Sequence, residues 1–539
     1  MINAASRRRE AILLAAVCMF LFFYGLGAFG LLGADEPRYA QVAREMFERQ
    51  DWITPTLGHQ PWLEKPVLFY WEAEIAYSLF GVSDWAARLP SAVTATLLVL
   101  AAYLFLRRFR PGAELNGALM IAASVAVTGF ARSAATDMLL AANFSIALLA
   151  WYAWYETRSR HWLLPGYFFL GLAVLAKGPV AIGLAGLILI LFAVAQRNLR
   201  LIFKSFWMPG ILVFLLTVLP WYIAVQLRNP QFVRVFILEH NLARFGTNLY
   251  RHHQPFWFYL PVALIGLLPW TALVIAAVIE TVRGWISEGS RMFSSEGGVA
   301  EDALDIFLLI WLVVPVIFFS IAQAKLPGYI LPALPAAPIL TALYIRRRAT
   351  SGPPTSQGLL FFHCILAASL LFGALVAPSL VVARHLPVGS QTAIFGFICL
   401  LLAVVFYLVL RSRSGLNLVH AVTLVPVLLS VGAIIRLEAP SLDFQMSTRP
   451  VALAFPANTA SLPIAVMGVP RQTEYGLQFY RNQSVQRYER GEVPAAEHVL
   501  IAPEAAFTEM THFVGTRHVT LVGAVPQQHI ALYRISAAQ

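Results

Sequence analysis

Residues 11–40, "AILLAAVCMFLFFYGLGAFGLLGADEPRYA", lead an apolar run directly into two adjacent acids, Asp35 and Glu36. The run from Ala11 to Leu32 is long enough to cross a bilayer as one helix. An ionised carboxylate at the edge of a hydrocarbon layer is costly and is therefore seldom without a function. This stretch predicts a membrane protein with its chemistry at the end of the first span.

The composition supports a membrane protein with many spans. Of the 539 residues, 59% are hydrophobic and only 12% are charged, which excludes an ordinary soluble protein. About thirteen spans are predicted, near residues 11–32, 89–106, 115–131, 138–155, 162–176, 179–195, 207–226, 258–280, 305–323, 328–345, 359–382, 392–410 and 418–435. The first span is too long for a removed signal peptide, and it lacks the cleavage site of small residues that such a peptide has. The three cysteines lie in apolar runs and indicate neither disulfides nor a metal cluster.

Basic residues predict the orientation of the chain. They cluster in alternate connections, at residues 7–9, 107–110, 158–160, 197–204, 283–291, 346–348 and 411–413. The positive-inside rule assigns these connections to the cytoplasm, so the amino terminus lies inside and the carboxyl terminus outside. Residues 1–436 are then a transmembrane domain whose main outer loops are 33–88 and 227–257.

Residues 437–539 differ in pattern from the rest of the chain. Short β-branched runs alternate with polar turns ("IAVMGV", "HVLIAP", "HVTLVG", "HIALYRI"), and "YGLQFYRN" has helical character. This pattern predicts a small soluble α/β domain on the outer face.

The first outer loop is acidic, with nine Asp/Glu against five Lys/Arg in residues 33–88. Its apolar residues Tyr39, Val42, Ala43, Met46 and Phe47 share one helical face, which predicts an amphipathic helix on the membrane surface. Asp35 is placed to cap that helix. A cap and a catalytic acid are both consistent with this position.

The lysines are few and unevenly placed. There are four beside thirty-five arginines, and three of them, Lys65, Lys177 and Lys325, lie in outer connections next to a span end and a proline. A lysine there is either an interfacial anchor whose charged end reaches water or a ligand for phosphate, which a compact ammonium suits.

Three further features of the outer loops are consistent with either a structural or a functional role. Loop 227–257 carries four arginines, three histidines and a single acid, which suits a solvated amphipathic helix or the wall of an anion site. Asp137, near Arg132, is a helix cap, a member of a local ion pair or a second acid. Glu64 could join the histidines around a divalent cation, although no CxxC or HExxH spacing is present.

The motifs of residues 33–345 resemble those of a known family. "ADEPRYA", "DWITP", "EKPVLFYW", "LAKGPV", "FILEHNLARF", "HHQPFWFYLP" and "KLPGYILPALP" occur in the order found in polyprenyl-phosphate-dependent glycosyltransferases of the GT-C fold, within the protein-mannosyltransferase-like superfamily. The resemblance is closest to the 4-amino-4-deoxy-L-arabinose transferases that modify lipid A. One departure is His253, where a basic residue is expected beside the histidine, so His252 is the safer equivalent.

The resemblance implies roles for individual residues. Asp35, Asp137 and Glu36 are expected at the catalytic centre, and Lys65, Arg251 and Tyr39 at the donor phosphate. An acceptor or anion site is expected from Lys177, Lys325, Tyr329 and Arg244, and a divalent cation from Glu64 and His252.

The implied reaction transfers an aminoarabinose-type sugar from undecaprenyl phosphate to lipid A phosphates. It would take place at the periplasmic face of the bacterial inner membrane and alter lipopolysaccharide charge and polymyxin resistance. The donor is already activated, no Gly-rich phosphate loop is present, and no nucleotide or nucleic acid is expected; the protein is expected to be a monomer.

Two alternatives stay open. A protein O-glycosyltransferase of the same fold would differ only in its acceptor. A lipid-linked sugar flippase could use a lateral basic cleft, although a transporter should carry ionisable residues near the midplane of two related halves.

Overall fold

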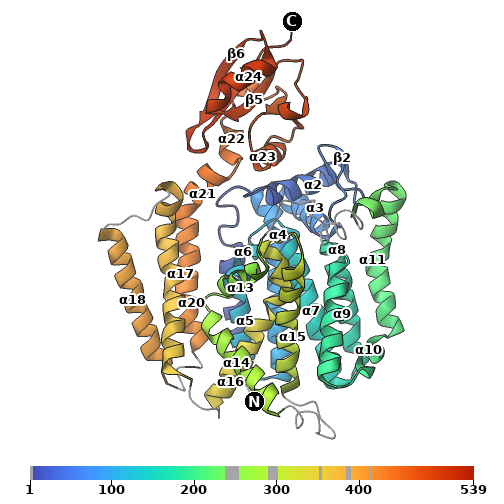
Figure 1. The fold of residues 1–539 in the computed structure, drawn as a ribbon, viewed down its shortest axis with the longest axis vertical. Coiled ribbons are helices and arrows are strands. Elements are labelled where there is room, and N and C mark those ends of the chain that lie inside the picture. Colours follow the sequence, from blue (N-terminus) through green and yellow to red (C-terminus); the bar gives the residue numbers. More distant parts are fainter. Residues whose placement is uncertain are drawn as a thin grey trace.

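The computed structural model describes residues 4–236, 254–288, 302–350, 355–383, 390–412, 416 and 418–538. A bundle of roughly parallel helices carries a small α/β domain at one end (Figure 1). The amino terminus lies at the far end of the bundle and the carboxyl terminus in the α/β domain. The two termini therefore lie at opposite ends of the molecule.

Seven described helices are long and apolar enough to cross a membrane. They are α4 (Asp84–Phe109), α7 (Thr136–Thr157), α11 (Met208–Arg228), α15 (Asp302–Ile321), α17 (Gln357–Ala383), α18 (Ser390–Leu410) and α20 (Val419–Ala433) with its continuation to Met446. The predicted class, an α-helical polytopic membrane protein, is confirmed, and the count of thirteen spans stays a prediction.

Three predicted spans are bent helix pairs, which raise the count of spans to ten if each pair crosses once. The bends are 60° between α5 (Glu114–Ala122) and α6 (Val125–Ala131), and 43° between η5 (Pro327–Ala333) and α16 (Ala336–Thr350). The pair of α13 (Tyr259–Gly266) and α14 (Thr271–Glu288) is bent by 115°. These breaks free backbone groups inside apolar segments, where irregular backbone is tolerated only if protein or water covers it.

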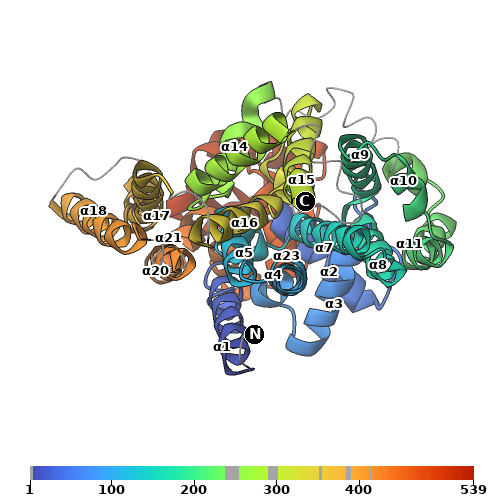
Figure 2. The same ribbon diagram turned by 90° about the horizontal axis from the view of Figure 1, so that it is seen from below.

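The helices form a centre and two flanks when viewed from below (Figure 2). Helices α4, α5, α7 and α16 lie in the centre, and α17, α18 and α20 on one side. On the other side lie α8 (Leu163–Lys177), α9 (Val180–Ala195), α10 (Arg200–Ser205) and α11. The first helix, α1 (Ala4–Cys18) with η1 (Met19–Phe23), packs at the edge of the centre.

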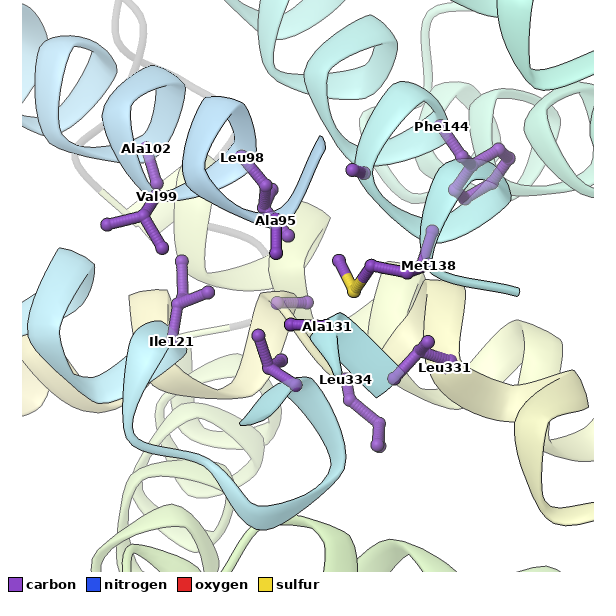
Figure 3. Close-up of a cluster of buried hydrophobic side chains, with 14 of the residues drawn as sticks. Ala95, Leu98, Val99, Ala102, Ile121, Ala131, Met138, Phe144, Leu331 and Leu334 are labelled. Carbon is purple, nitrogen blue, oxygen red and sulfur yellow. The ribbon is translucent and has the colours of Figure 1, made fainter. Parts of the chain in front are cut away.

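A cluster of buried hydrophobic side chains packs together α4, α5, α7 and η5, which include the helix that carries Asp137 and the segment that carries Tyr329 (Figure 3). Leu98 of α4, Ile121 of α5 and Met138 of α7 are fully buried, and Leu331 of η5 is 1% exposed. Met138 follows Asp137, and Leu331 lies two residues after Tyr329. Close packing of this kind leaves little freedom to the residues beside it.

The predicted amphipathic helix is α2 (Asp35–Arg49), which lies across the outer end of the bundle beneath the α/β domain (Figure 1). Its apolar face packs against protein, whereas the prediction placed it on the membrane surface: Tyr77 of α3 (Leu68–Phe80) donates a hydrogen bond to the Ala40 carbonyl at 3.1 Å. The hairpin β1 (Thr56–Leu57) and β2 (Gln60–Pro61) connects the two helices.

The α/β domain has a five-stranded sheet in the order β4-β3-β5-β7-β6. Its strands are β3 (Ile464–Val466), β4 (Val485–Arg487), β5 (His498–Pro503), β6 (Val519–Val525) and β7 (Ile530–Ile535). Strands β4 and β5 pair with β3 in parallel, and β7 pairs with β5 and β6 in antiparallel. The predicted runs contain β3, β5 and β7 and all of β6 but its last two residues, whereas the short β4 was not predicted. "YGLQFYRN" lies in α23 (Arg471–Arg481) apart from its last residue, Asn482.

The α/β domain holds the segment that leads to Asp35. The Gly30 amide donates to Asp443 Oδ1 at 2.8 Å, and the Leu31 amide donates to the Tyr480 hydroxyl at 2.7 Å. Tyr480 in turn donates to Asp84 Oδ1 at 2.7 Å. Arg449 bridges the carboxylates of Asp84 and Asp443 at 3.0 and 2.7 Å. The segment that leads into α2 is thus held by hydrogen bonds to Asp443 and Tyr480, which lie more than 400 residues further along the chain.

Candidate active site at the outer end of the bundle

Glu36 is a buried structural acid. Its carboxylate pairs with Arg88 at 2.7 Å and accepts hydrogen bonds from the amides of Leu32 and Ala134, both at 2.7 Å. Burial alone would raise the pKa of Glu36, but the Arg88 charge and these hydrogen bonds outweigh it and lower the pKa. Because Ala134 lies two residues before the start of α7, Glu36 ties the start of α2 to the start of the helix that carries Asp137.

Asp35 faces away from this buried pair. The N-cap of α2 is Ala34, and no side chain caps the helix, so the interpretation of Asp35 as the cap is wrong. Asp35 is the first residue of the helix, its side chain is 56% exposed, and it pairs with Arg38 at 2.5 Å. Because more than half of its side chain is exposed, the Asp35 charge is accessible to a substrate, although its partner Arg38 is only 15% exposed.

Tyr39 links the two predicted acids. Its ring lies in the aromatic cluster with Phe69 and Tyr70, and its hydroxyl accepts a hydrogen bond from Arg38 at 3.3 Å. Burial raises the pKa of Tyr39, and the charges of Asp35 and Asp137 add to that rise. Tyr39 therefore stays neutral and lies within electrostatic reach of both acids.

Asp137 and Lys177 form the second half of the site. Asp137 Oδ1 lies 2.5 Å from Lys177 Nζ, and Lys177 Nζ lies 4.9 Å from the centre of the Tyr329 ring. The neighbouring Gly328 makes this approach possible, because a Cβ there would lie 2.4 Å from Asp137 Oδ1. Of the interpretations left open for Asp137, the structure shows an ion pair, and its partner is Lys177 rather than Arg132.

The remaining predicted residues differ in how the structure places them. Glu64 lies 3.9 Å from Arg38, Lys65 follows it and is partly buried, and Lys325 is 7% exposed and donates to the Ala322 carbonyl at 2.6 Å. Arg244, Arg251 and His252 lie outside the described residues. Within the described residues, no three His, Cys, Asp or Glu side chains gather as a metal site would require.

Two residues of this cluster were not predicted from the sequence. Arg38 contacts Asp35, Glu64 and Tyr39, and its guanidinium lies 5.9 Å from the ring of Tyr475 in the α/β domain. Tyr70 is fully buried, and its hydroxyl has no hydrogen-bond partner among the described residues. The spacing of Arg38 three residues after Asp35 is a signal for a helical ion pair, whereas Tyr70 is marked by nothing but its place in an aromatic run.

Known proteins share both the sequence and the fold of this chain. A family model described as dolichyl-phosphate-mannose-protein mannosyltransferase matches residues 64–223. The chain is 33% identical over 319 residues to undecaprenyl phosphate-alpha-4-amino-4-deoxy-L-arabinose arabinosyl transferase from Edwardsiella ictaluri, covering 58% of this chain and 55% of the relative. The protein of the same name from Serratia proteamaculans is 31% identical over 385 residues, covering 68% and 66%. The chain thus spans between about half and two thirds of the length of these relatives.

A solved structure matches almost the whole chain. The crystal structure of ArnT from Cupriavidus metallidurans bound to undecaprenyl phosphate superposes with a TM-score of 0.77 at 22% identity, covering 98% of this chain and 99% of that one. The chain is ArnT-like and has the GT-C fold. The predicted resemblance is confirmed, and the described cluster lies at the end of the GT-C bundle that carries the α/β domain (Figure 1).

Proposed function

We propose that this protein transfers an aminoarabinose-type sugar from undecaprenyl phosphate to lipid A phosphate groups at the periplasmic face of the inner membrane. The observation that carries the proposal is a pair of acids at the end of the bundle that carries the α/β domain: Asp35, whose side chain is 56% exposed, and Asp137, which is 17% exposed and paired with Lys177. The sequence relatives named for an aminoarabinose transferase support the choice of sugar and donor.

The chemistry needs charges of both signs. The bond between the anomeric carbon and the donor phosphate oxygen breaks, and the anomeric carbon passes through an oxocarbenium-like state before an acceptor phosphate oxygen bonds to it. Asp35 stabilises the positive anomeric centre. Lys65 and Arg251 stabilise the leaving polyprenyl phosphate, and Lys177, Lys325 and Arg244 offset the charge of the acceptor phosphate. Tyr329 lies beside Lys177 and forms the wall of the acceptor side.

Asp35→Asn tests the central role. The variant should fold like the wild type, with an unfolding free energy within about 1 kcal/mol, because only a surface ion pair is lost. Transfer of sugar from donor to acceptor, measured by thin-layer chromatography in detergent micelles, should be abolished. Wild-type turnover in a folded Asp35→Asn protein would contradict the proposal.

The lysines separate the donor from the acceptor. Lys177→Ala should raise the KM of the phosphate acceptor with much less change in the KM of the donor, and Lys65→Ala should do the reverse. Lys204→Ala, on the predicted cytoplasmic side, is the matched control and should change neither. If neither Lys177 nor Lys325 affects the acceptor KM, a hydroxyl acceptor replaces the phosphate, as in a protein O-glycosyltransferase.

Lipids from cells with and without the gene distinguish the proposal from its alternatives. A pentosamine added to lipid A, seen by mass spectrometry, supports the proposal. An unchanged lipid A with altered protein glycans would favour the protein O-glycosyltransferase. The divalent cation proposed at Glu64 and His252 is tested by chelation: transfer should fall with EDTA and return with added cation.

A further inference from the structure

A cavity of about 980 Å³ lies beside Glu36, on the side of the bundle formed by α17 and α20. Its walls are mostly apolar and come from α6, α17 and α20, with Val125, Leu370, Ala374, Val427 and Val431 among them. Gly129, Ser369 and Gly373 also line it and are exposed, so the cavity opens at the surface of the bundle. An open apolar slot between membrane helices suits a hydrocarbon chain.

Arg132 places a positive charge in this slot, which Glu36 and Glu438 also line. Its guanidinium donates to the carbonyls of Leu21 and Gly25, both at 3.0 Å, and no salt bridge joins it to an acid in the described part of the chain. Burial, and to a smaller extent the charge of Arg88, lower the pKa of Arg132. A largely buried charge without a counter-ion is costly, so an anionic group at the end of the slot would be stabilised there.

Glu438 adds a hydrogen-bond acceptor to the lining of the slot. It ends the π-helical turn η6 (Ile434–Glu438), is 3% exposed and lines the slot. Its Oε1 atom has no hydrogen-bond partner among the described residues. π-Helical turns within longer helices are frequent at functional sites. The ligand should therefore offer an N–H or O–H group close to the point where its hydrocarbon chain joins its polar part.

We propose that this slot binds the acyl chains of the acceptor lipid. Arg132 then pairs with an anionic group of that lipid, and Glu438 accepts a hydrogen bond from one of its amide or hydroxyl groups. This inference rests on the proposed function and names the part of the site that selects an acylated phosphoglycolipid. A polyprenyl chain is hydrocarbon beyond its phosphate and has no donor for Glu438. The donor and acceptor lipids then approach α2 from different sides, the donor beside Lys65 and the acceptor beside Glu36.

Filling the slot tests the proposal without removing any polar group. A Cβ at Gly373 or Gly129 would meet no atom within 4 Å, so leucine fits at either position and also favours the helix. Gly186→Leu on α9 is the matched control, since its Cβ also meets no atom within 4 Å and the residue lies outside the slot. Arg132→Gln tests the charge, and Arg436→Gln, exposed two residues before Glu438, is its control.

The measurement is native mass spectrometry of delipidated protein in nanodiscs with two separate probes, hexa-acylated lipid A and undecaprenyl phosphate. Gly373→Leu and Arg132→Gln should weaken lipid A binding by about tenfold or more, equivalent to 1.4 kcal/mol, and leave undecaprenyl phosphate binding within about twofold. Loss of undecaprenyl phosphate binding would assign the slot to the donor, and unchanged binding of both lipids would also overturn the inference. Because binding is read without turnover, an inactive wild-type protein that binds lipid A in the slot would contradict the proposed function alone.

Discussion

Asp35 and Glu36 are neighbours in the chain and have opposite environments. The Asp35 side chain is 56% exposed, whereas that of Glu36 is 8% exposed and paired with Arg88. Successive residues of a helix point about 100° apart, so one acid can face the substrate while the next faces the core. The sequence predicted both as catalytic acids because the partner of Glu36 lies 52 residues further on and is brought there by the packing of α4.

Glu36→Gln should therefore lower the stability of the protein as well as its rate of sugar transfer. Removing one partner of a buried ion pair leaves the Arg88 charge uncompensated, which typically costs about 3–5 kcal/mol. Thermal unfolding in detergent should show a much lower midpoint than for Asp35→Asn, which makes the same acid-to-amide change one residue earlier. Equal midpoints for the two variants would show that the Arg88 pair is not structural.

Glu74 of α3 should make stability depend on pH. Burial, with a smaller effect of the Asp51 charge, outweighs Arg49 and raises the pKa of Glu74 from 4.5 to about 8. The folded state then binds more protons than the unfolded state between these values. Its free energy of unfolding should fall as pH rises from 4.5 to 8, by up to about 1.4 kcal/mol per pH unit.

Glu74→Gln removes this titrating group. Between pH 5.5 and 8 the wild-type unfolding midpoint should drop more than that of Glu74→Gln, measured by differential scanning fluorimetry in detergent. Glu509→Gln, an exposed acid in the α/β domain, should keep the wild-type slope. Identical slopes for the wild type and Glu74→Gln would mean that Glu74 is charged in the folded protein at neutral pH.

At the scale of elements, the second half of the site depends on how closely η5 approaches α7. The Cβ of Gly328→Ala would lie 2.4 Å from Asp137 Oδ1 and 2.9 Å from its Cγ, so the carboxylate would have to leave Lys177. Transfer should fall by about tenfold or more, equivalent to 1.4 kcal/mol, in a protein that still folds. Gly284→Ala in α14, where the added Cβ meets no atom within 4 Å, should keep wild-type turnover in the same assay.

Elements were more predictable from the sequence than the contacts between them. Hydrophobic runs predicted the helices and most strands, since burial of one face or of a whole span leaves a period in the sequence. The 115° bend between α13 and α14 lies inside a single apolar run, where the hydrophobic period does not show it; Pro269 at the bend marks a break but not its angle. The same holds for the site: charge and proximity to span ends singled out Asp35, Asp137 and Lys177, whereas the pairing of Asp137 with Lys177 joins residues 40 apart.

On the scale of the whole molecule, Tyr480 joins the α/β domain to the segment that leads into α2 and to Asp84, the first residue of α4. Tyr480→Phe removes one hydrogen bond from the Leu31 amide and another to Asp84, and should lower the free energy of unfolding by about 1–3 kcal/mol. Thermal unfolding in detergent measures the loss. Tyr533→Phe, which removes a hydroxyl from the sheet of the same domain, should have a smaller effect; equal effects would mean that the Tyr480 bridge contributes nothing specific.

The bridge also has a consequence for biosynthesis. Gly30 and Leu31 leave the ribosome early, but Asp443 and Tyr480, which bind their amides, follow 413 and 449 residues later. Domains fold in the order of synthesis, so α2, which begins at Asp35, is made long before the α/β domain whose side chains hold the segment in front of it. A nascent chain released before Tyr480 has emerged would lack the Tyr480 hydrogen bonds to the Leu31 amide and to Asp84, and the protein should become active only once its last domain has folded.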